Sequence, residues 1–275
     1  MTSPARPSGV ITITTDFGHQ GPFVGVMKGV ILTRFPEARI VDLTHEIVVH
    51  WPAEAGFWLA RAFEYFPPGT VHIAVVDPGV GTSREIVAVS AHDHVFLAPD
   101  NGLLAPVIAR HPSAAVIRFD AQRIARLGLH RPSATFHGRD IFAPVAGWLS
   151  KGVAPSEFGP EISDYVQAPL PQVERVGENS LRGVIVKVDK FGNLITNIAE
   201  SDVFEMSAKG SPVSILISGQ TLTRICRSYA EGGEDEVFAI VGSSGYLELA
   251  AKQASAAEKL AASVGSPVGV VAGQS

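Results

Sequence analysis

Two apolar stretches of this chain each end in an aspartate followed by a turn, and this arrangement constrains the fold most. Residues 10–15 alternate and are β-branched, as in a strand, and Asp16 follows them. Residues 71–76 are almost uniformly apolar, as in a buried strand, and they continue into Asp77 and a Pro-Gly turn. In open α/β sheets, ligands bind beyond the carboxyl ends of the strands. Both aspartates are therefore candidates for a binding site.

Strand and helix patterns alternate over the first part of the chain. Helical spacing of apolar residues covers residues 23–35 and 53–66. Further elements are expected as strands at 39–43, 86–90 and 95–98 and as helices at 103–109 and 141–149. This alternation favours an α/β domain with a mostly parallel sheet, which we place at residues 8–170.

The pattern changes near residue 170, where residues 169–173 are expected to form a linker. Short strands separated by turn residues are then expected at 181–188, 194–198, 213–217, 220–224 and 237–241. Such a series favours a smaller antiparallel β-barrel domain, which we place at residues 176–265. The Gly-rich segment after Val264 is expected to fray.

Composition and charge argue against several classes of protein. The 275 residues carry a formal net charge of −5, whereas a nucleic-acid-binding domain needs a clustered basic face. The single cysteine, Cys226, excludes an internal disulfide and a cysteine-rich zinc site, and it fits a cytoplasmic protein. We expect neither a signal peptide nor a membrane-spanning segment, because no apolar run has the required length and flanks.

Polar residues follow both aspartate-terminated strands. Asp16 can accept two hydrogen bonds at once, so it is a candidate for binding the vicinal hydroxyls of a ribose. The alternative is an Asx turn or a cap of the helix that starts near Phe23. Arg84 comes seven residues after Asp77, and the two could form a charged site or merely a turn with a surface ion pair.

A third cluster, residues 136–140, contains His137 just before a predicted helix. A histidine titrates near neutral pH and can act as a base or orient one. The alternative is a helix-capping segment with a surface ion pair between Arg139 and Asp140.

A fourth cluster lies in the second domain. Asp189, Phe191 and Asn193 are followed by Asn197, and such groups can read the edge of a purine and stack on its ring. The alternative is an ordinary hairpin that contains Gly192.

Other familiar sites are not indicated. The chain has neither a P-loop nor the glycine-rich dinucleotide motif. Residues 92–94, His-Asp-His, are expected in an exposed turn, where weak metal binding is left open. His45 and His50 lack a third ligand for a metal.

Taken together, six motifs resemble those of the S-adenosylmethionine hydrolase (hydroxide adenosyltransferase) family, which is related to fluorinating and chlorinating enzymes. In chain order, the motifs are residues 15–18, residues 76–82 with Arg84, residues 98–104, residues 136–140, Asp189 with residues 191–193, and residues 242–248.

The resemblance implies a hydrolase that converts S-adenosylmethionine to adenosine and L-methionine without a cofactor or metal. It also implies a homotrimer whose active sites lie between the N-terminal domain of one subunit and the C-terminal domain of the next. The halogenating relatives differ from this chain at His137 and lack an equivalent of Arg84, which favours hydroxide over halide.

The resemblance also assigns site residues. Its catalytic aspartate, arginine and histidine fall on Asp77, Arg84 and His137, which we expect to converge although 60 positions separate the first from the last. Its ribose-binding aspartate falls on Asp16. Its other substrate contacts fall on Asp189, Asn193, Ser243 and Ser244, with Phe191 as a ring partner and Tyr246 and Glu248 as further positions.

Two alternatives to the hydrolase stay open from the sequence. One is a halide-using transferase that acts on the same substrate. The other is a protein that binds adenosine or S-adenosylmethionine without catalysis.

Overall fold

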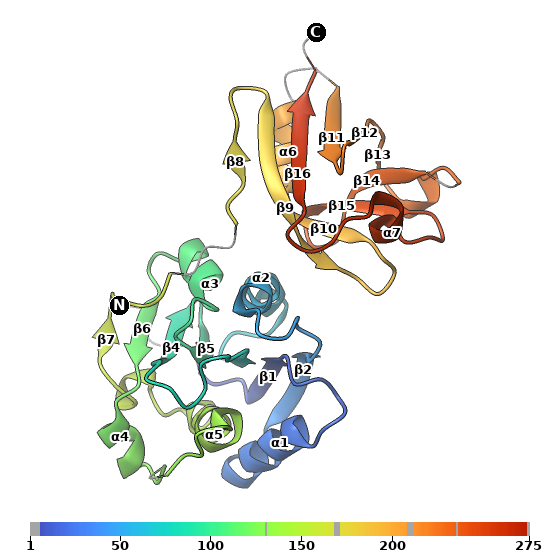
Figure 1. Ribbon diagram of the computed structural model, residues 1–275. Helices are drawn as coiled ribbons and strands as arrows, with labels where there is room; N and C mark the ends of the chain where they lie inside the picture. Colours follow the sequence, from blue (N-terminus) through green and yellow to red (C-terminus); the bar gives the residue numbers. More distant parts are fainter. Residues whose placement is uncertain (1–5, 130, 168–170, 208–211, 235, 274–275) are drawn as a thin grey trace. The chain divides into compact units, whose positions relative to one another are not determined.

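The computed structural model describes residues 6–129, 131–167, 171–207, 212–234 and 236–273. The chain divides into two compact units, Met1–Leu170 and Pro171–Ser275 (Figure 1). The expected linker begins at Pro169, and Pro169 and Leu170 lie outside the described residues. In the described part of the chain, no helix has the length and apolar character needed to cross a bilayer.

The N-terminal unit is built on a seven-stranded sheet with the order β2-β1-β3-β5-β4-β6-β7 (Figure 1). Its strands are β1 (Val10–Thr15), β2 (Arg39–Thr44), β3 (Val71–Val75), β4 (Ile86–Ala91), β5 (His94–Pro99), β6 (Ala115–Arg118) and β7 (Glu161–Ile162). The first four strands in this order pair in parallel, and the remaining three pairings are antiparallel. The α/β class is confirmed, but the expectation of a mostly parallel sheet is wrong, because the sheet is mixed.

A two-residue turn explains the difference. His92 and Asp93 join β4 to β5, with φ angles of 47° and 62°, and Ala91 pairs with His94 across the hairpin. A two-residue connection with positive φ at both positions produces an antiparallel hairpin, whereas a parallel crossover needs about a dozen residues. His94 is also buried and bonded to His72, so only the first two residues of the expected exposed turn are exposed.

Helices cover both faces of this sheet (Figure 1). Ile11 and Ile13 of β1 face a core that includes Met27 and Ile31, and burying each such side chain stabilises the fold by roughly 1.5–3 kcal/mol. That face carries α1 (Phe23–Arg34) and α5 (Ala143–Ser150), with Ile124 of α4 (Ala121–Arg126) in the same core. The other face carries α2 (Pro52–Ala62), the 3-10 turn η1 (Phe63–Tyr65) and α3 (Ala105–Arg110). The short turns η2 (Gly138–Phe142) and η3 (Pro155–Glu157) flank α5.

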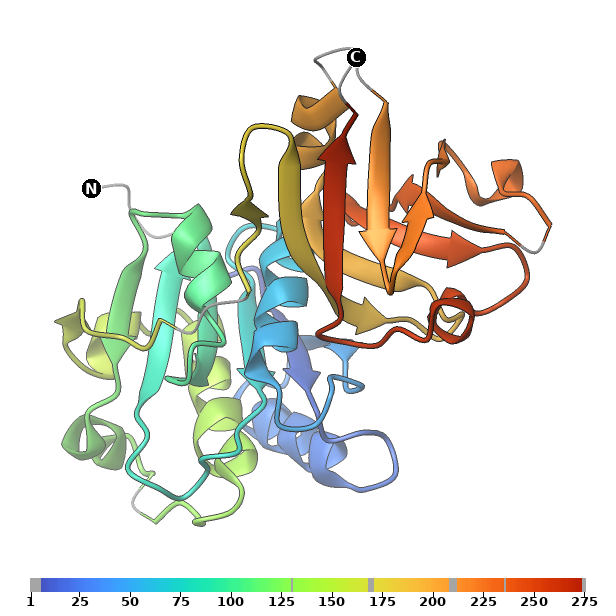
Figure 2. The same cartoon turned by 45° about the horizontal axis from the view of Figure 1, so that its top comes forward.

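The C-terminal unit is a curled nine-stranded sheet (Figure 2). Its strands are β8 (Glu174–Arg175), β9 (Ser180–Val188), β10 (Leu194–Ala199), β11 (Val213–Ile217), β12 (Gln220–Leu222), β13 (Ile225–Cys226), β14 (Val237–Val241), β15 (Tyr246–Ala251) and β16 (Pro267–Ala272). All recorded pairings are antiparallel except that between β13 and β14. Two helices, α6 (Glu200–Ser207) and α7 (Ala256–Leu260), and the turn η4 (Tyr229–Glu231) complete the unit. The sheet is a curled half-barrel, and Ile185, Ile215 and Leu249 lie in its core.

The expectation that the segment after Val264 frays is wrong. It contains β16, which pairs with β9 on one side and β11 on the other. Val268, Val270 and Ala272 alternate into the core and are at most 4% exposed. The strand pattern is therefore present in the sequence, but its small, Gly-rich composition conceals it.

Candidate active site

The structure brings Asp77, Arg84 and His137 together in one hydrogen-bonded group, which confirms their expected convergence. Arg84 Nε donates to both carboxylate oxygens of Asp77 at 3.0 Å, and Arg84 Nη2 donates to Asp77 Oδ2 at 2.5 Å. The same Nη2 lies 2.6 Å from Nδ1 of His137. The side chains of Asp77 and Arg84 are only 4% and 11% exposed, so they are not a solvated surface pair.

A glycine and an asparagine position this group. Gly81, in the turn between Asp77 and Arg84, has a φ of +77°, and a Cβ there would lie 2.1 Å from the carbonyl oxygen of Ala134. The turn can therefore pack against the segment just before His137 only because residue 81 is glycine. At the end of β3, Asn101 Nδ2 donates to the carbonyl of Val76 at 2.9 Å.

Arg84 determines which nitrogen of His137 is protonated. A guanidinium group can only donate, so Nδ1 of His137 must accept, and the neutral ring carries its proton on Nε2. Burial and the charge of Arg84 lower the pKa of His137, although the charges of Asp77 and Asp140 oppose them. At neutral pH the ring is therefore uncharged and offers an N–H donor at Nε2.

Of the alternative interpretation of residues 136–140, the ion pair between Arg139 and Asp140 is correct. Arg139 and Asp140 form an ion pair, with Nε of Arg139 2.5 Å from Oδ1 of Asp140. Asp140 Oδ2 also accepts from the backbone N–H of Ser133. His137 precedes the π-helical turn η2 but makes no capping hydrogen bond with its side chain. It is therefore available to the group formed with Arg84.

Asp16 is not a helix cap. Helix α1 begins after Pro22 without a side-chain cap, and Asp16 Oδ2 instead accepts from the backbone N–H of His50 at 3.0 Å. Asp16 is partly exposed at the end of β1. Its carboxylate keeps unused acceptor capacity.

The C-terminal unit contains a separate set of predicted residues around the β9–β10 hairpin. Asp189 Oδ1 accepts from the backbone N–H groups of Phe191 and Asn193, and Asp189 Oδ2 accepts from Asn193 Nδ2 at 2.9 Å. Gly192 has a φ of +82°, and a Cβ there would lie 2.2 Å from Ser255 Oγ. The hairpin alternative is therefore correct as local structure, and its tip packs closely on the start of α7.

This hairpin borders a pocket of about 840 Å³ within the C-terminal unit. Asp189, Phe191 and Asn193 line the pocket, and the Phe191 side chain is 67% exposed. The remaining lining residues are Tyr229, Ala230 and residues 251–255. A volume in this range suits a ligand the size of a nucleoside.

Sequence reasoning missed Tyr229, whose hydroxyl donates to Glu248 Oε2 at 3.0 Å. Burial and the neighbouring Glu248 charge raise the pKa of Tyr229 to about 12. Burial also raises the pKa of Glu248, and the charge of Asp189 adds to this effect. Tyr229 is the one aromatic residue between residues 227 and 236, and an isolated aromatic in a polar loop was the available signal.

The remaining predicted residues lie at the turn between β14 and β15. Ser243 is exposed, whereas the hydroxyl of Ser244 is buried and has no hydrogen-bond partner in the described residues. Tyr246 begins β15 and is partly buried. A Cβ at Gly242 would lie 1.7 Å from Glu248 Oε1, so the turn closes tightly over Glu248.

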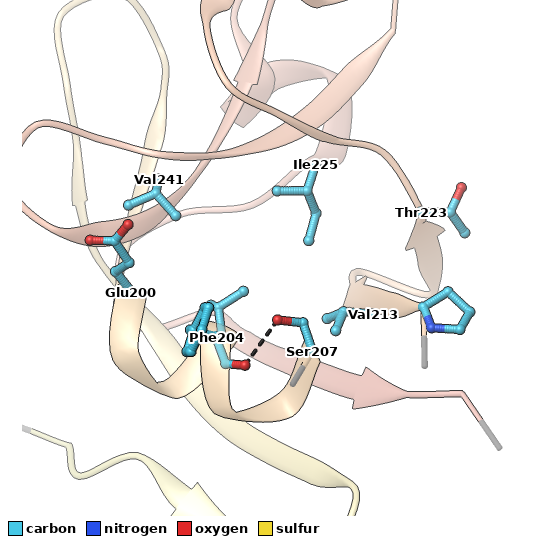
Figure 3. Close-up of a pocket in the computed structure, with 9 residues that line it drawn as sticks. Glu200, Phe204, Ser207, Val213, Thr223, Ile225 and Val241 are labelled. Atoms are coloured by element: carbon cyan, nitrogen blue, oxygen red, sulfur yellow. Dashed lines mark hydrogen bonds between the residues drawn. The ribbon is translucent and has the colours of Figure 1, made fainter. Parts of the chain in front are cut away.

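A second hollow in the same unit, of about 470 Å³, contains none of the predicted residues (Figure 3). Phe204, Val213 and Ile225 line it, and its one carboxylate belongs to Glu200. Figure 3 also shows the hydroxyl of Ser207 bonded to the carbonyl of Phe204, which leaves the hollow mostly apolar. Across the described residues, His, Cys, Asp and Glu side chains form no group that suits a metal ion.

Comparison with known proteins places the chain in a family. Models of the SAM hydroxide adenosyltransferase N-terminal and C-terminal domains match residues 11–159 and 183–269. The chain is 35% identical over 258 residues to the (R)-S-adenosyl-L-methionine hydrolase of Thermus thermophilus, covering 92% of this chain and 96% of the relative. It is 34% identical over 275 residues to the enzyme of that name from Salinispora tropica, covering 97% and 99%. An uncharacterized conserved protein from Thermotoga maritima has a similar crystal structure, with a TM-score of 0.86 and 32% identity over 95% of this chain and 99% of that one. The chain therefore belongs to the SAM hydroxide adenosyltransferase family.

Proposed function

We propose that the protein hydrolyses S-adenosyl-L-methionine to adenosine and L-methionine. The family and the named relatives point to this substrate. The observation that carries the proposal is the hydrogen-bonded group of Asp77, Arg84 and His137, which can activate water. A guanidinium between a carboxylate and an uncharged imidazole is suited to holding and polarising a small nucleophile.

The chemistry requires an activated water. Water attacks C5′ of the ribose, the C5′–S bond breaks, and methionine leaves as a neutral thioether. The attacking oxygen gives up a proton and becomes the 5′-hydroxyl of adenosine. Bulk water is a very weak acid and a poor nucleophile without assistance. An anionic nucleophile and a cationic sulfonium neutralise each other on the way to the transition state, so a water-poor site favours the reaction.

The geometry suggests different roles for the three side chains. Because Nδ1 of His137 is occupied by Arg84, its Nε2–H can donate to the attacking oxygen but cannot accept a proton from it. Asp77 then serves as the acceptor for that proton, and Arg84 supplies the positive potential that favours hydroxide character. All three are catalytic residues in this proposal.

We propose that the other predicted residues bind the substrate. Asp16 accepts hydrogen bonds from the ribose hydroxyls, and the pocket around Phe191 receives the adenine ring. Asp189 and Asn193 contact the adenine edge, and Ser243 and Ser244 contact the methionine portion. Tyr246 and Glu248 complete the set, to which the structure adds Tyr229 as a pocket residue. The buried, unpartnered hydroxyl of Ser244 supports a polar contact there.

We also propose a homotrimer in which two subunits share each active site. The proposal follows from the family resemblance, and the confinement of the catalytic residues to one unit and of the pocket to the other supports it. Mixing two inactive variants tests it, for example Arg84→Ala with Asn193→Ala. Mixed oligomers regain activity if the two halves of a site come from different subunits. Mixtures that stay inactive after subunit exchange contradict a shared site.

Product analysis tests the function itself. The protein is incubated with S-adenosyl-L-methionine, with and without chloride, and the products are separated by chromatography. Adenosine and methionine support the proposal, 5′-chloroadenosine indicates a halide transferase, and unchanged substrate with measurable binding indicates a binding protein. We propose that no metal or cofactor takes part, so prior treatment with a chelator should leave the rate unchanged.

A further inference from the structure

A chain of polar side chains in the N-terminal unit ends beside Asp16. Lys28 Nζ lies 2.5 Å from Asp42 Oδ2, and Asp42 Oδ1 lies 3.1 Å from His45 Nε2. Nδ1 of His45 lies 2.9 Å from the hydroxyl of Thr15, the residue that precedes Asp16. The four side chains come from α1, β2, the start of the β2–α2 loop and β1.

The charge of Asp42 favours one arrangement of protons between His45 and Thr15. The backbone N–H of Phe17 donates to Thr15 Oγ1 at 3.2 Å, so the Thr15 hydroxyl proton is free to point at His45 Nδ1. A neutral His45 that accepts at Nδ1 carries its proton on Nε2, facing Asp42. That contact has the distance of an ion pair but falls outside good hydrogen-bond angles, so Asp42 holds the proton mainly by its charge. Thr15 and His45 are 0% and 1% exposed, so the contact between these two side chains is shielded from water.

The backbone fastens the same two segments together. Gly18 N donates to the carbonyl of His45 at 2.9 Å, and Ile47 N donates to the carbonyl of Thr15 at 3.4 Å. His50 N donates to the carboxylate of Asp16 itself at 3.0 Å. The segment that begins at His45 therefore contacts the residues before and after Asp16 and the Asp16 side chain.

We propose that His45, held in one tautomer by Asp42, is a positioning residue that keeps Asp16 in its substrate-binding orientation. His45 acts through Thr15 and through the backbone of residues 45–50, and it touches no substrate itself. The inference rests on the proposed function only in that Asp16 is taken to bind the ribose. Nothing in the catalytic group of Asp77 requires this chain of side chains.

The fold provides a matched control on the same strand. Thr12 Oγ1 bonds to Nδ1 of His72 at 2.7 Å, so β1 contains two threonine–histidine hydrogen bonds. Thr12, Thr15 and His72 are all 0% exposed. Thr12 lies four positions before Asp16, and no hydrogen bond of Thr12 or His72 reaches the residues around Asp16 in the described structure. Replacing either threonine with valine removes a buried threonine–histidine bond. Thr15→Val also removes the acceptor of the Phe17 amide, so both bonds lost at position 15 lie beside Asp16.

The test compares Thr15→Val, Thr15→Ser and Thr12→Val. Adenosine affinity is measured by titration calorimetry, and kcat and KM are measured with S-adenosyl-L-methionine. We expect Thr15→Val to weaken adenosine binding by about five- to tenfold, the order expected when the buried hydrogen bonds of the Thr15 hydroxyl are lost, with kcat changed far less. Thr15→Ser should restore the affinity, and Thr12→Val should leave it unchanged even if it lowers the melting temperature equally.

Hydrogen exchange gives a second measurement that does not depend on the function. In Thr15→Val, the amides of Gly18 and His50, which bond to the His45 carbonyl and to the Asp16 carboxylate, should exchange about five- to tenfold faster than in wild type, whereas Thr12→Val should not alter them. Should Thr15→Val fold poorly, Asp42→Asn can replace it as the test variant. It removes the charge of the partly exposed Asp42 and should shift adenosine affinity and amide exchange in the same directions.

A failure of the positioning role and a failure of the proposed function give different results. Equal adenosine affinities and equal exchange in the two valine variants would overturn the positioning role while leaving the hydrolase proposal intact. A wild-type protein that neither binds adenosine nor cleaves the substrate would overturn the proposed function. The exchange rates of the Gly18 and His50 amides would then decide the positioning role alone.

Discussion

The two units present opposite kinds of site. In the N-terminal unit, Asp77 and Arg84 are nearly buried and bonded directly to each other, and Arg84 is also bonded to His137. In the C-terminal unit, the pocket is open, and Phe191 is 67% exposed. Bond-making requires charges fixed in advance, whereas binding a flat ring requires an accessible surface that the ligand itself covers. The comparison fits the proposal that the first unit carries the chemistry and the second most of the recognition.

The largest expected effect is on the chemical step. Arg84→Ala should lower kcat by about 10²–10⁴-fold, the usual contribution of a positioned acid–base group, because it removes the positive charge and releases His137. Adenosine affinity should change little. Steady-state kinetics and calorimetry check the two quantities separately.

Arg84→Ala also leaves the buried carboxylate of Asp77 without its cation, so melting temperatures must accompany the kinetics. The double variant Asp77→Asn/Arg84→Ala removes that charge and serves as the control for stability. A raised KM with an unchanged kcat would contradict the assignment of chemistry to this unit.

A smaller effect is expected at Asp16, the one predicted binding residue in the N-terminal unit. Asp16→Ala should weaken adenosine binding by roughly 1.5–3 kcal/mol, the net value of hydrogen bonds to a charged group. Asp16→Asn keeps one acceptor oxygen and should fall between the wild type and Asp16→Ala. Calorimetry with adenosine measures both. A variant that binds as tightly as the wild type removes Asp16 from the site.

Removing the Phe191 ring tests the binding role of the C-terminal unit. Phe191→Ala should weaken adenosine binding by about tenfold, within the range for loss of one base–aromatic contact, with kcat nearly unchanged. Phe204→Ala is the matched control, because Phe204 is 71% exposed in the same unit but lines the other hollow (Figure 3). Equal affinities of the two variants would show that the pocket around Phe191 does not receive the ring.

The pairing of Asp77 with Arg84 could be anticipated from short-range features, whereas the approach of His137, 53 positions after Arg84, was expected only from the family resemblance. Asp16 and Asp77 follow strongly patterned strands. Arg84 lies only seven residues after Asp77, at the other end of the turn, and bonds to it. Tyr229 had only a weak signal, an isolated aromatic in a polar loop, and its place in the pocket depends on its bond to Glu248, 19 positions away. The network through His45 likewise depends on the packing of separate elements.

The fold was predictable to a similar degree. Alternation identified β1 and an apolar run identified β3, but strand direction depends on connections that composition does not reveal. The hairpin turn at His92 and Asp93 lacks the usual Asn-Gly or Asp-Gly signature, so the antiparallel half of the sheet was missed. β16 was missed because glycine and proline obscure its alternation.

Acid stability should differ in sign between the two units. Burial and the charge of His94 lower the pKa of His72 to about 3, so the unfolded chain binds this proton more readily than the folded one. As pH falls from about 6.5 toward 3, the N-terminal unit should lose on the order of 1 kcal/mol of stability per pH unit. Glu248 has a raised pKa, so the folded C-terminal unit should gain stability as its carboxyl is protonated.

Fluorescence can separate the two units, because the three tryptophans, at positions 51, 58 and 148, all lie in the N-terminal unit. Acid unfolding followed by tryptophan emission should begin at a higher pH in wild type than in His72→Phe, which has no proton to gain. Coincident acid transitions in the two proteins would remove His72 as the cause.

Oxygen-isotope labelling tests most directly whether this protein activates water against the substrate. The reaction is run with S-adenosyl-L-methionine in ¹⁸O-water, and the products are examined by mass spectrometry. We predict adenosine with one ¹⁸O atom, at its 5′-hydroxyl, and unlabelled methionine, and both should disappear together in Arg84→Ala. Unlabelled adenosine, or label in the amino-acid product, would contradict attack by water at C5′.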